Sequence, residues 1–119
     1  MSGAVTGMEE FLDLFWQLEE VELFDHGRYS KLEVAGRPFG YLWEPTRTVG
    51  LKQTRAEQEA LVGERPDVFE TQFTAGSFGW VVVHLDKIER EELAELTFEA
   101  WRLSAPRRLV EARGDHLPA

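Results

Sequence analysis

The sequence predicts a single α+β domain in which helices cover one face of an antiparallel sheet of about five strands. Segments with apolar residues at helical spacing lie near both ends of the chain, at about residues 7–20 and 87–104. Short apolar segments separated by turn residues lie between them and indicate hairpins. The chain has 119 residues, which is the size of one domain. A parallel sheet or an all-helical bundle would contradict this prediction.

The first helix is expected over about residues 7–20. Thr6 and Glu9 match a capping box, in which the hydroxyl accepts from the backbone of the first turn and the carboxylate reaches back. The apolar face of this helix repeats at three- and four-residue spacing and consists of Phe11, Leu14, Phe15 and Leu18.

An antiparallel meander of three strands is expected next, at about residues 31–34, 38–43 and 48–52. Ala35-Gly36 turns the chain after the first strand, and Pro45 suits the first corner of a turn after the second. The meander therefore forms one half of the predicted sheet.

A short second helix is predicted by Thr54 and Glu57, which match another capping box, and it ends before Gly63. Two further strands are expected around residues 70–74 and 78–85. The second of them is almost continuously apolar, so we expect it to lie inside the sheet.

The last long helix is expected to use Asp86 as its cap and to run over about residues 87–104. Its apolar residues cover roughly 220° of its circumference, so it must pack on the sheet and on a second element. A short terminal helix with Pro106 at its first position is a candidate for that element. The order is therefore α-β-β-β-α-β-β-α, followed by the short helix.

The domain is expected to span residues 7–113, with flexible ends at 1–6 and 114–119. The chain contains no cysteine, which excludes disulfides, thiolate metal sites and cysteine nucleophiles. It shows no N-terminal signal segment and no apolar run of about 18 residues. We therefore expect a cytoplasmic protein with no membrane role.

Five short segments occur in an order and spacing that resembles the MmcQ/YjbR family. These segments are VAGRPF at 34–39, VGLK at 49–52, RPDV at 65–68, WVVV at 80–83 and LSAPRRL at 103–109. The resemblance covers residues 8–113 and implies a frataxin-like α+β fold, together with DNA binding by a double-wing sheet surface. The loop 73–77 lacks the basic residues that the family often carries there, which argues against a DNA contact by that loop.

Basic residues gather on the predicted meander, although the whole chain has a net charge of −9. Residues 27–55 carry six bases and two acids. Such a patch, with about four phosphate contacts, predicts weak, salt-sensitive and non-specific binding to double-stranded DNA. The alternative is that these charges only protect sheet edges or stabilise the end of a helix. The predicted DNA-binding residues are Arg28, Lys31, Arg37, Arg47, Lys52, Arg55, Arg107 and Arg108.

Three aromatic residues on the predicted strands could stack against bases or a planar ligand. They are Tyr41, Trp43 and Trp80. Alternating aromatic residues on a strand are more often part of a core, so both interpretations stay open at this point.

No catalytic, cofactor or metal site is expected. The sequence contains no nucleophile elbow, phosphate-binding loop or HExxH motif. The three histidines are far apart, and His84 is expected to be a hydrogen-bonded strand residue. A regulatory or partner-binding domain without a nucleic-acid role is the alternative function. Loose cation binding by acidic helix faces is a variant of it, with the acids Glu9, Glu10, Asp13, Glu91, Glu92, Glu95 and Glu99.

Overall fold

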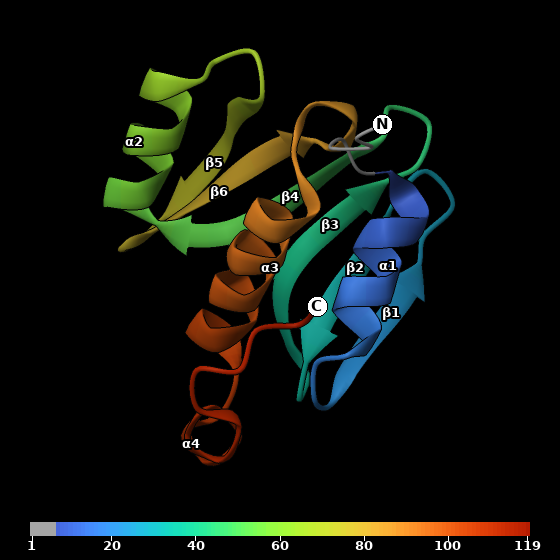
Figure 1. The fold of residues 1–119 in the computed structure, drawn as a ribbon, viewed down its shortest axis with the longest axis vertical. Helices are drawn as coiled ribbons and strands as arrows, with labels where there is room; N and C mark the ends of the chain where they lie inside the picture. Colours follow the sequence, from blue (N-terminus) through green and yellow to red (C-terminus); the bar gives the residue numbers. More distant parts are fainter. Residues whose placement is uncertain (1–6) are drawn as a thin grey trace.

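The computed structural model describes residues 7–119, and the predicted cap Thr6 lies outside this range. Within it, six strands form one antiparallel sheet in the order β1-β2-β3-β4-β6-β5. The elements in chain order are α1 Met8–Trp16, β1 Val21–Asp25, β2 Ser30–Val34, β3 Arg37–Trp43, β4 Thr48–Thr54, α2 Arg55–Glu64, β5 Phe69–Ala75, β6 Phe78–His84, the 3-10 turn Leu85–Lys87, α3 Arg90–Ser104 and α4 Arg107–Arg113 (Figure 1). The predicted fold class is confirmed, with one strand more than expected.

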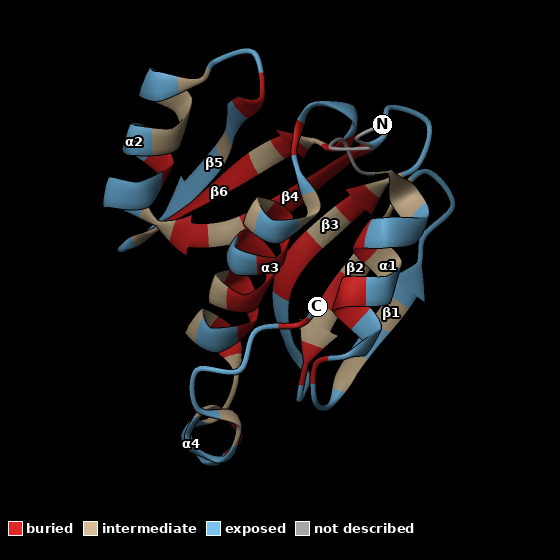
Figure 2. Ribbon diagram, viewed as in Figure 1, coloured by how far each residue is buried: buried red, intermediate tan, exposed pale blue. Residues whose placement is uncertain are grey.

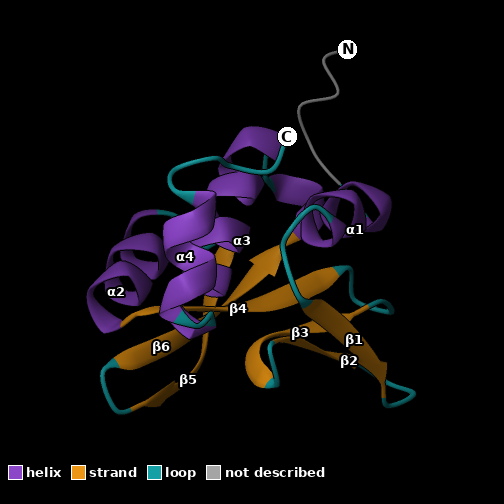
Figure 3. Ribbon diagram, turned by 90° about the horizontal axis from the view of Figure 1, so that it is seen from below, coloured by secondary structure: helices purple, strands orange, loops and turns teal. Residues whose placement is uncertain are grey.

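The core lies between the sheet and the helices, and buried residues face each other across this layer (Figure 2). All four α-helices lie on one side of the sheet (Figure 3). Trp101 of α3 is fully buried, and its indole Nε1 donates to the Glu19 carbonyl 3.0 Å away. No helix in the described part of the chain is long and apolar enough to span a bilayer.

Strand β1 was not predicted, because the first helix ends at Trp16 instead of about residue 20. Glu20 has a left-handed backbone with φ of 55°, and its carbonyl accepts from the Ala35 amide. A helix cannot continue through that conformation. The chain therefore turns and adds β1 to the edge of β2, where Val21 pairs with Val34.

The local turn signals are confirmed. Ala35 and Gly36 both have positive φ and join β2 to β3, as in a type I′ hairpin. The Thr54 hydroxyl accepts from the Glu57 amide at 3.1 Å and caps α2 as predicted. Helix α4 matches the predicted terminal helix, although it begins at Arg107 and Pro106 is the residue before it and not its first residue.

The predicted cap at Asp86 is wrong. Helix α3 begins at Arg90, and Asp86 lies in the 3-10 turn that follows β6. Leu85 and Ile88 on either side of Asp86 are both buried, and Ile88 has an extended backbone. Burial of these two side chains forces the chain to turn before the helix can start.

The sheet divides along the line between β3 and β4. These strands pair only from Gly40–Leu51 to Trp43–Thr48. On the other side of the Gly40–Leu51 pair they separate, and β3 remains paired with β2 while β4 remains paired with β6. The C-terminal end of α3 lies over this division (Figure 1). Ser104 bridges it, because its hydroxyl donates to the Pro38 carbonyl and accepts from Lys52 Nζ.

The segment 114–119, which the sequence predicts to be flexible, folds back over α1 and α3 (Figure 1). Pro118 is buried, and the Ala119 amide donates to Gln17 Oε1 at 2.9 Å. Arg113 holds the start of this segment through the His116 carbonyl.

Candidate nucleic-acid interface

The side of the sheet turned away from the helices, here called the open face, carries most of the candidate residues. Tyr41 on β3 lies between Lys31 on β2 and Gly50 on β4, and Gly50 pairs with Val82 on β6. Directly paired residues share a face of the sheet. The neighbours of Tyr41 along β3, Gly40 and Leu42, face the helices instead. Tyr41 and its partners therefore line the open face.

Aromatic rings form a continuous series across the open face, here called the aromatic run. Its members are His26, Tyr29, Trp43, Tyr41, Phe73 and Trp80. Tyr29 stacks on Trp43 with ring centroids 5.0 Å apart, and Phe73 stacks on Trp80 at 4.5 Å. Phe73 is 39% exposed, whereas Trp80 beneath it is only 7% exposed. Rings accessible to a ligand are therefore Phe73, Tyr41, Tyr29 and Trp43.

The open face is concave. Tyr41 and Phe73 have ring centroids 6.4 Å apart, although β4 and β6 lie between their strands. Three strand spacings in a flat sheet would separate the two backbones by about 14 Å. Gly50 permits this approach, because a Cβ there would lie 2.0 Å from Gln72 Oε1. The carboxamide of Gln72 thus fills the space above Gly50.

Helix α2 fixes the position of the Phe73–Trp80 pair from the other side of the sheet. A β-bulge at Gln72 interrupts the pairing of β5 with β6, so that Phe73 pairs with Trp80. Buried Gln58 of α2 donates through Nε2 to the Phe73 carbonyl at 3.1 Å and to the Trp80 carbonyl at 3.0 Å. These bonds hold both residues of the stacked pair at the bulge.

Two buried polar atoms beside this pair have no hydrogen-bond partner among the described residues. They are Gln72 Oε1 and Trp80 Nε1. An unpaired buried acceptor or donor costs about 1–3 kcal/mol. A polar group that reached either atom would recover part of that free energy.

The basic residues of the meander lie at the two ends of the open face. Arg28 and Arg47 are in the turns after β1 and β3, which share one end of an antiparallel sheet, and are here called the turn-end cations. The opposite end has the Ala35-Gly36 hairpin and the end of β4. Arg37, Lys52 and Arg55 lie there and are here called the hairpin-end cations.

None of these five cations makes an ion pair with a described residue, and all four arginines are exposed. Lys52 Nζ lies 4.1 Å from the Phe78 ring centroid and 5.6 Å from that of Trp80. Burial lowers the pKa of the Lys52 ammonium below its ordinary value, and the nearby Arg37 guanidinium lowers it further. The hairpin end thus holds two cations, Arg37 and Lys52, that make no ion pair with a described residue.

The remaining predicted cations are neutralised. Lys31 lies 3.4 Å from Glu33 on the same strand. Arg107 pairs with Glu111 at 2.8 Å and Arg108 with Glu20 at 2.9 Å. Arg108 lowers the pKa of the Glu20 carboxyl through this hydrogen bond. Both arginines belong to α4, on the helix side of the sheet, so the structure does not bring them together with the meander cations (Figure 3).

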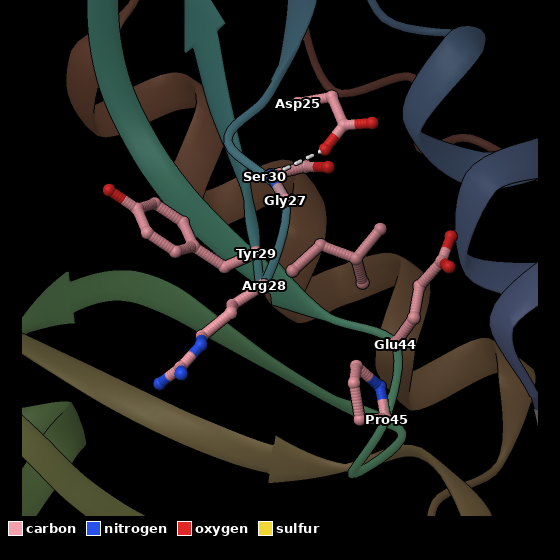
Figure 4. Close-up of a pocket in the computed structure, with 8 residues that line it drawn as sticks. Asp25, Gly27, Arg28, Tyr29, Ser30, Glu44 and Pro45 are labelled. Carbon is pink, nitrogen blue, oxygen red and sulfur yellow. Dashed lines mark hydrogen bonds between the residues drawn. The ribbon is translucent and has the colours of Figure 1, made fainter.

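A surface hollow of about 360 Å³ lies between the β1–β2 and β3–β4 turns. It is lined by Asp25, Gly27, Arg28, Tyr29, Ser30, Leu42, Glu44 and Pro45. Asp25 Oδ1 accepts from the Gly27 amide at 2.8 Å and closes the first turn. Arg28 and Glu44 extend in different directions from this hollow (Figure 4). The guanidinium therefore remains available at the end of the open face.

Several of the other titratable candidates have structural partners, whereas Glu9, Glu10, Glu91 and Glu95 make no ion pair with a described residue. His84 lies on the open side of β6 beside the Glu70 carboxylate, to which its Nε2 is hydrogen-bonded. On the acidic helix faces, Asp13 pairs with Arg90, Glu92 with Arg65 and Glu99 with Arg102. Within residues 7–119, no three His, Asp or Glu side chains are grouped so as to hold a metal ion.

The sequence interpretation identified Tyr41, Trp43 and Trp80 but not Tyr29, Phe73 or Gln72. The bulge at Gln72 turns Phe73 onto the open face, and no local feature of the sequence predicts this bulge. Tyr29 could have been found, because it lies only two residues before the predicted first strand of the meander.

Three curated relatives match part of the chain. They are the uncharacterized proteins Mb2600 of Mycobacterium bovis and MT2646 and Rv2570 of Mycobacterium tuberculosis. Each is 40% identical over 53 residues, which are 44% of this chain and 41% of the relative. The match thus spans less than half the length of these relatives.

The fold has a solved counterpart in the Deinococcus radiodurans protein DR2400, a DUF419 domain, with a TM-score of 0.75. The match covers 94% of this chain and 91% of that one at 14% identity, so it shows a common fold. The family model described as YjbR matches residues 16–103. This match covers the entire sheet, α2 and all but the last residue of α3, and the chain belongs to the YjbR family.

Proposed function

We propose that this protein binds DNA weakly, without catalysis, through the cations at the two ends of the open face. The observation that carries the proposal is that the cations of the open face lack ion-pair partners while those of α3 and α4 have them. The turn-end and hairpin-end cations make no ion pair with a described residue, whereas the arginines of α3 and α4 pair with carboxylates. A cation without an acidic partner can neutralise a phosphate without first breaking an ion pair.

The distance between the two groups of cations suits a nucleic-acid backbone. Strands of seven residues separate the two ends of the sheet, which corresponds to about 20 Å. At 3.4 Å per nucleotide along one strand, this distance covers about six nucleotides. Four contacts, from Arg28, Arg37, Arg47 and Arg55, predict a log–log salt slope of about −3.6. Affinity then falls about 150-fold between 50 and 200 mM salt.

Fluorescence polarisation with a labelled duplex of about 15 base pairs, titrated at several salt concentrations from about 50 mM upward, tests the proposal. The double variant Arg37→Gln/Arg47→Gln removes one cation from each end of the open face. It should bind more weakly at every salt concentration and change the slope to about −1.8.

The matched control is Arg107→Gln/Arg108→Gln, which removes the same charge from two ion-paired residues of α4. Its salt slope should stay near that of the unchanged protein. Equal losses for both double variants would show that net charge and not the open face determines binding. A duplex that is not bound at about 50 mM salt and high micromolar protein would exclude the DNA proposal altogether.

A partner-binding role is the second candidate, and the exposure of Trp16 favours it. This side chain is 56% exposed on α1, on the helix side of the sheet. An exposed indole is a frequent centre of protein interfaces. Sedimentation velocity at increasing concentration tests the simplest partner, a second copy, and a monomer at every concentration would exclude it.

A further inference from the structure

We infer that the open face takes single-stranded DNA in preference to duplex, with unpaired bases stacked on the aromatic run and phosphates at the hairpin-end cations. The inference rests on the proposed function and specifies the form of its ligand. It follows from three features of the open face, which are its accessible rings, its curvature and the placement of Lys52.

The accessible rings offer flat faces on which bases can stack. Phe73 is 39% exposed, and its inner face is already supported by Trp80 at 4.5 Å. Tyr29 and Trp43 form a second stacked pair at 5.0 Å toward the other end of the sheet. Tyr41 lies between the two pairs, 6.4 Å from Phe73 and 6.0 Å from Tyr29. Rings in such a series accept successive bases whatever their sequence, because every base has a π-face.

The curvature of the open face favours a single strand. Phe73 of β5 and Tyr41 of β3 lean together across β4 and β6, so the rings lie inside a concavity. Bases of a duplex are stacked on one another and present only their edges, so they cannot stack on these rings. Bases of a single strand can be turned outward and inserted between side chains.

Cations stand where the backbone of a stacked strand would pass. Lys52 Nζ is 5.6 Å from the centroid of Trp80, the ring directly beneath Phe73. Lys52 Nζ donates to the Ser104 hydroxyl at 2.9 Å, and neither Lys52 nor Arg37 makes an ion pair with a described residue. A phosphate at this end of the open face would supply the missing negative charge. Arg28 lies in the same turn as His26, at the other end of the aromatic run.

Buried polar atoms beneath the rings add hydrogen-bonding capacity. Gln72 Oε1 lies above Gly50, and Trp80 Nε1 lies below Phe73, and neither has a partner among the described residues. A polar group of a base that reached either atom would satisfy its hydrogen-bonding capacity. Binding should nevertheless show little sequence preference, since stacking makes the larger contribution.

The test compares labelled oligothymidylate of about 12 nucleotides with a duplex of the same length at about 50 mM salt. The single strand should bind more tightly. Phe73→Leu keeps an apolar side chain over Trp80 but removes the flat ring. It should weaken single-strand binding by about fivefold to 150-fold and leave duplex binding almost unchanged.

Trp16→Leu is the matched control, because Trp16 is another exposed aromatic residue but lies on α1. This variant should bind both oligonucleotides like the unchanged protein. Equal affinity for the two forms, or no effect of Phe73→Leu on the single strand, overturns the stacking inference and leaves weak DNA binding intact. Absence of binding to either oligonucleotide overturns the proposed function as well.

Discussion

Replacement of Gly79 by alanine should destabilise the protein through the side chain of Gln58. A Cβ at Gly79 would lie 2.5 Å from Gln58 Cδ, 2.6 Å from Oε1 and 2.8 Å from Nε2. Gln58 is only 4% exposed, so its side chain cannot avoid the new methyl group by a small rotation toward solvent. Its displacement breaks the hydrogen bonds to the Phe73 and Trp80 carbonyls. A buried acceptor left unpaired costs about 1–3 kcal/mol, and the half-buried Phe73 carbonyl should cost only about 1 kcal/mol, so the free energy of unfolding should fall by about 2–4 kcal/mol.

A double-mutant cycle isolates this cause. Gln58→Ala alone should cost about as much as Gly79→Ala, because it leaves the same two carbonyls without a partner. When Gly79→Ala is added to Gln58→Ala, the new methyl group has no carboxamide to clash with. The second substitution should therefore leave the free energy of unfolding nearly unchanged. The coupling free energy is then about 2–4 kcal/mol. Urea unfolding followed by circular dichroism at 222 nm measures all four proteins.

Gly50→Ala serves as the comparison for steric conflict alone. A Cβ at Gly50 would lie 2.0 Å from Gln72 Oε1, which is closer than any contact at Gly79. The Gln72 acceptor has no partner, and Gln72 belongs to the edge strand β5, so the side chain can turn away. The expected cost is below about 1 kcal/mol. Additive effects of Gln58→Ala and Gly79→Ala, or a larger cost for Gly50→Ala, would refute the reasoning.

Three other predictions concern single groups. Thr54→Ala removes the cap of α2 and should lower the free energy of unfolding by about 1 kcal/mol in the same urea assay; no change would contradict the cap. The Lys52 ammonium should titrate by NMR below its ordinary value of 10.5, and Arg37→Gln should raise that pKa only in part, because burial is the larger cause. Since the unfolded chain holds this proton more tightly, stability should rise with pH between the lowered pKa and 10.5. The pKa of the Glu20 carboxyl should lie below 4.5, and Arg108→Ala should raise it toward that value. The Glu20–Arg108 interaction therefore stabilises the fold above pH 4.5, and this contribution disappears as the pH falls through the lowered pKa.

Elements with a local chemical signal were predicted from the sequence. Thr54 with Glu57 located the start of α2, and Ala35-Gly36 located a hairpin whose two positive φ angles need such residues. Both motifs act within a few residues of the chain. The prediction therefore required no knowledge of the tertiary structure.

Elements that depend on distant contacts were missed or misplaced. Strand β1 exists because Glu20 turns the chain and β2 offers a free edge, and both facts follow from the assembled sheet. Asp86 has the chemistry of a cap, but burial of Leu85 and Ile88 decides where α3 begins. Burial outweighs a cap of about 1 kcal/mol.

The candidate site, like the fold, could be predicted only where the sequence carries a local signal. The sequence identifies the basic meander, because charges can be counted, but not which cations are paired with acids. Arg107 and Arg108 resemble Arg37 and Arg47 in the sequence. Glu111 lies four residues from Arg107 on the same helix, but only the fold brings Glu20 to Arg108. The aromatic run depends on the bulge at Gln72 and on the curvature over Gly50, which are properties of strand register.

Different residues supply the charges and the rings of the open face, so the two proposed contributions to binding can be distinguished by their dependence on salt. The turn-end and hairpin-end cations lie at the ends of the sheet and can contact phosphates of either form of DNA, so this contribution weakens as salt rises. Stacking on Phe73, Tyr41 and Tyr29 involves no counterion release and should persist. Duplex affinity should therefore vanish at high salt while a residual single-strand affinity remains. Because Phe73→Leu removes a ring and no charge, it should lower that residual affinity without changing the salt slope, whereas Arg37→Gln should do the reverse.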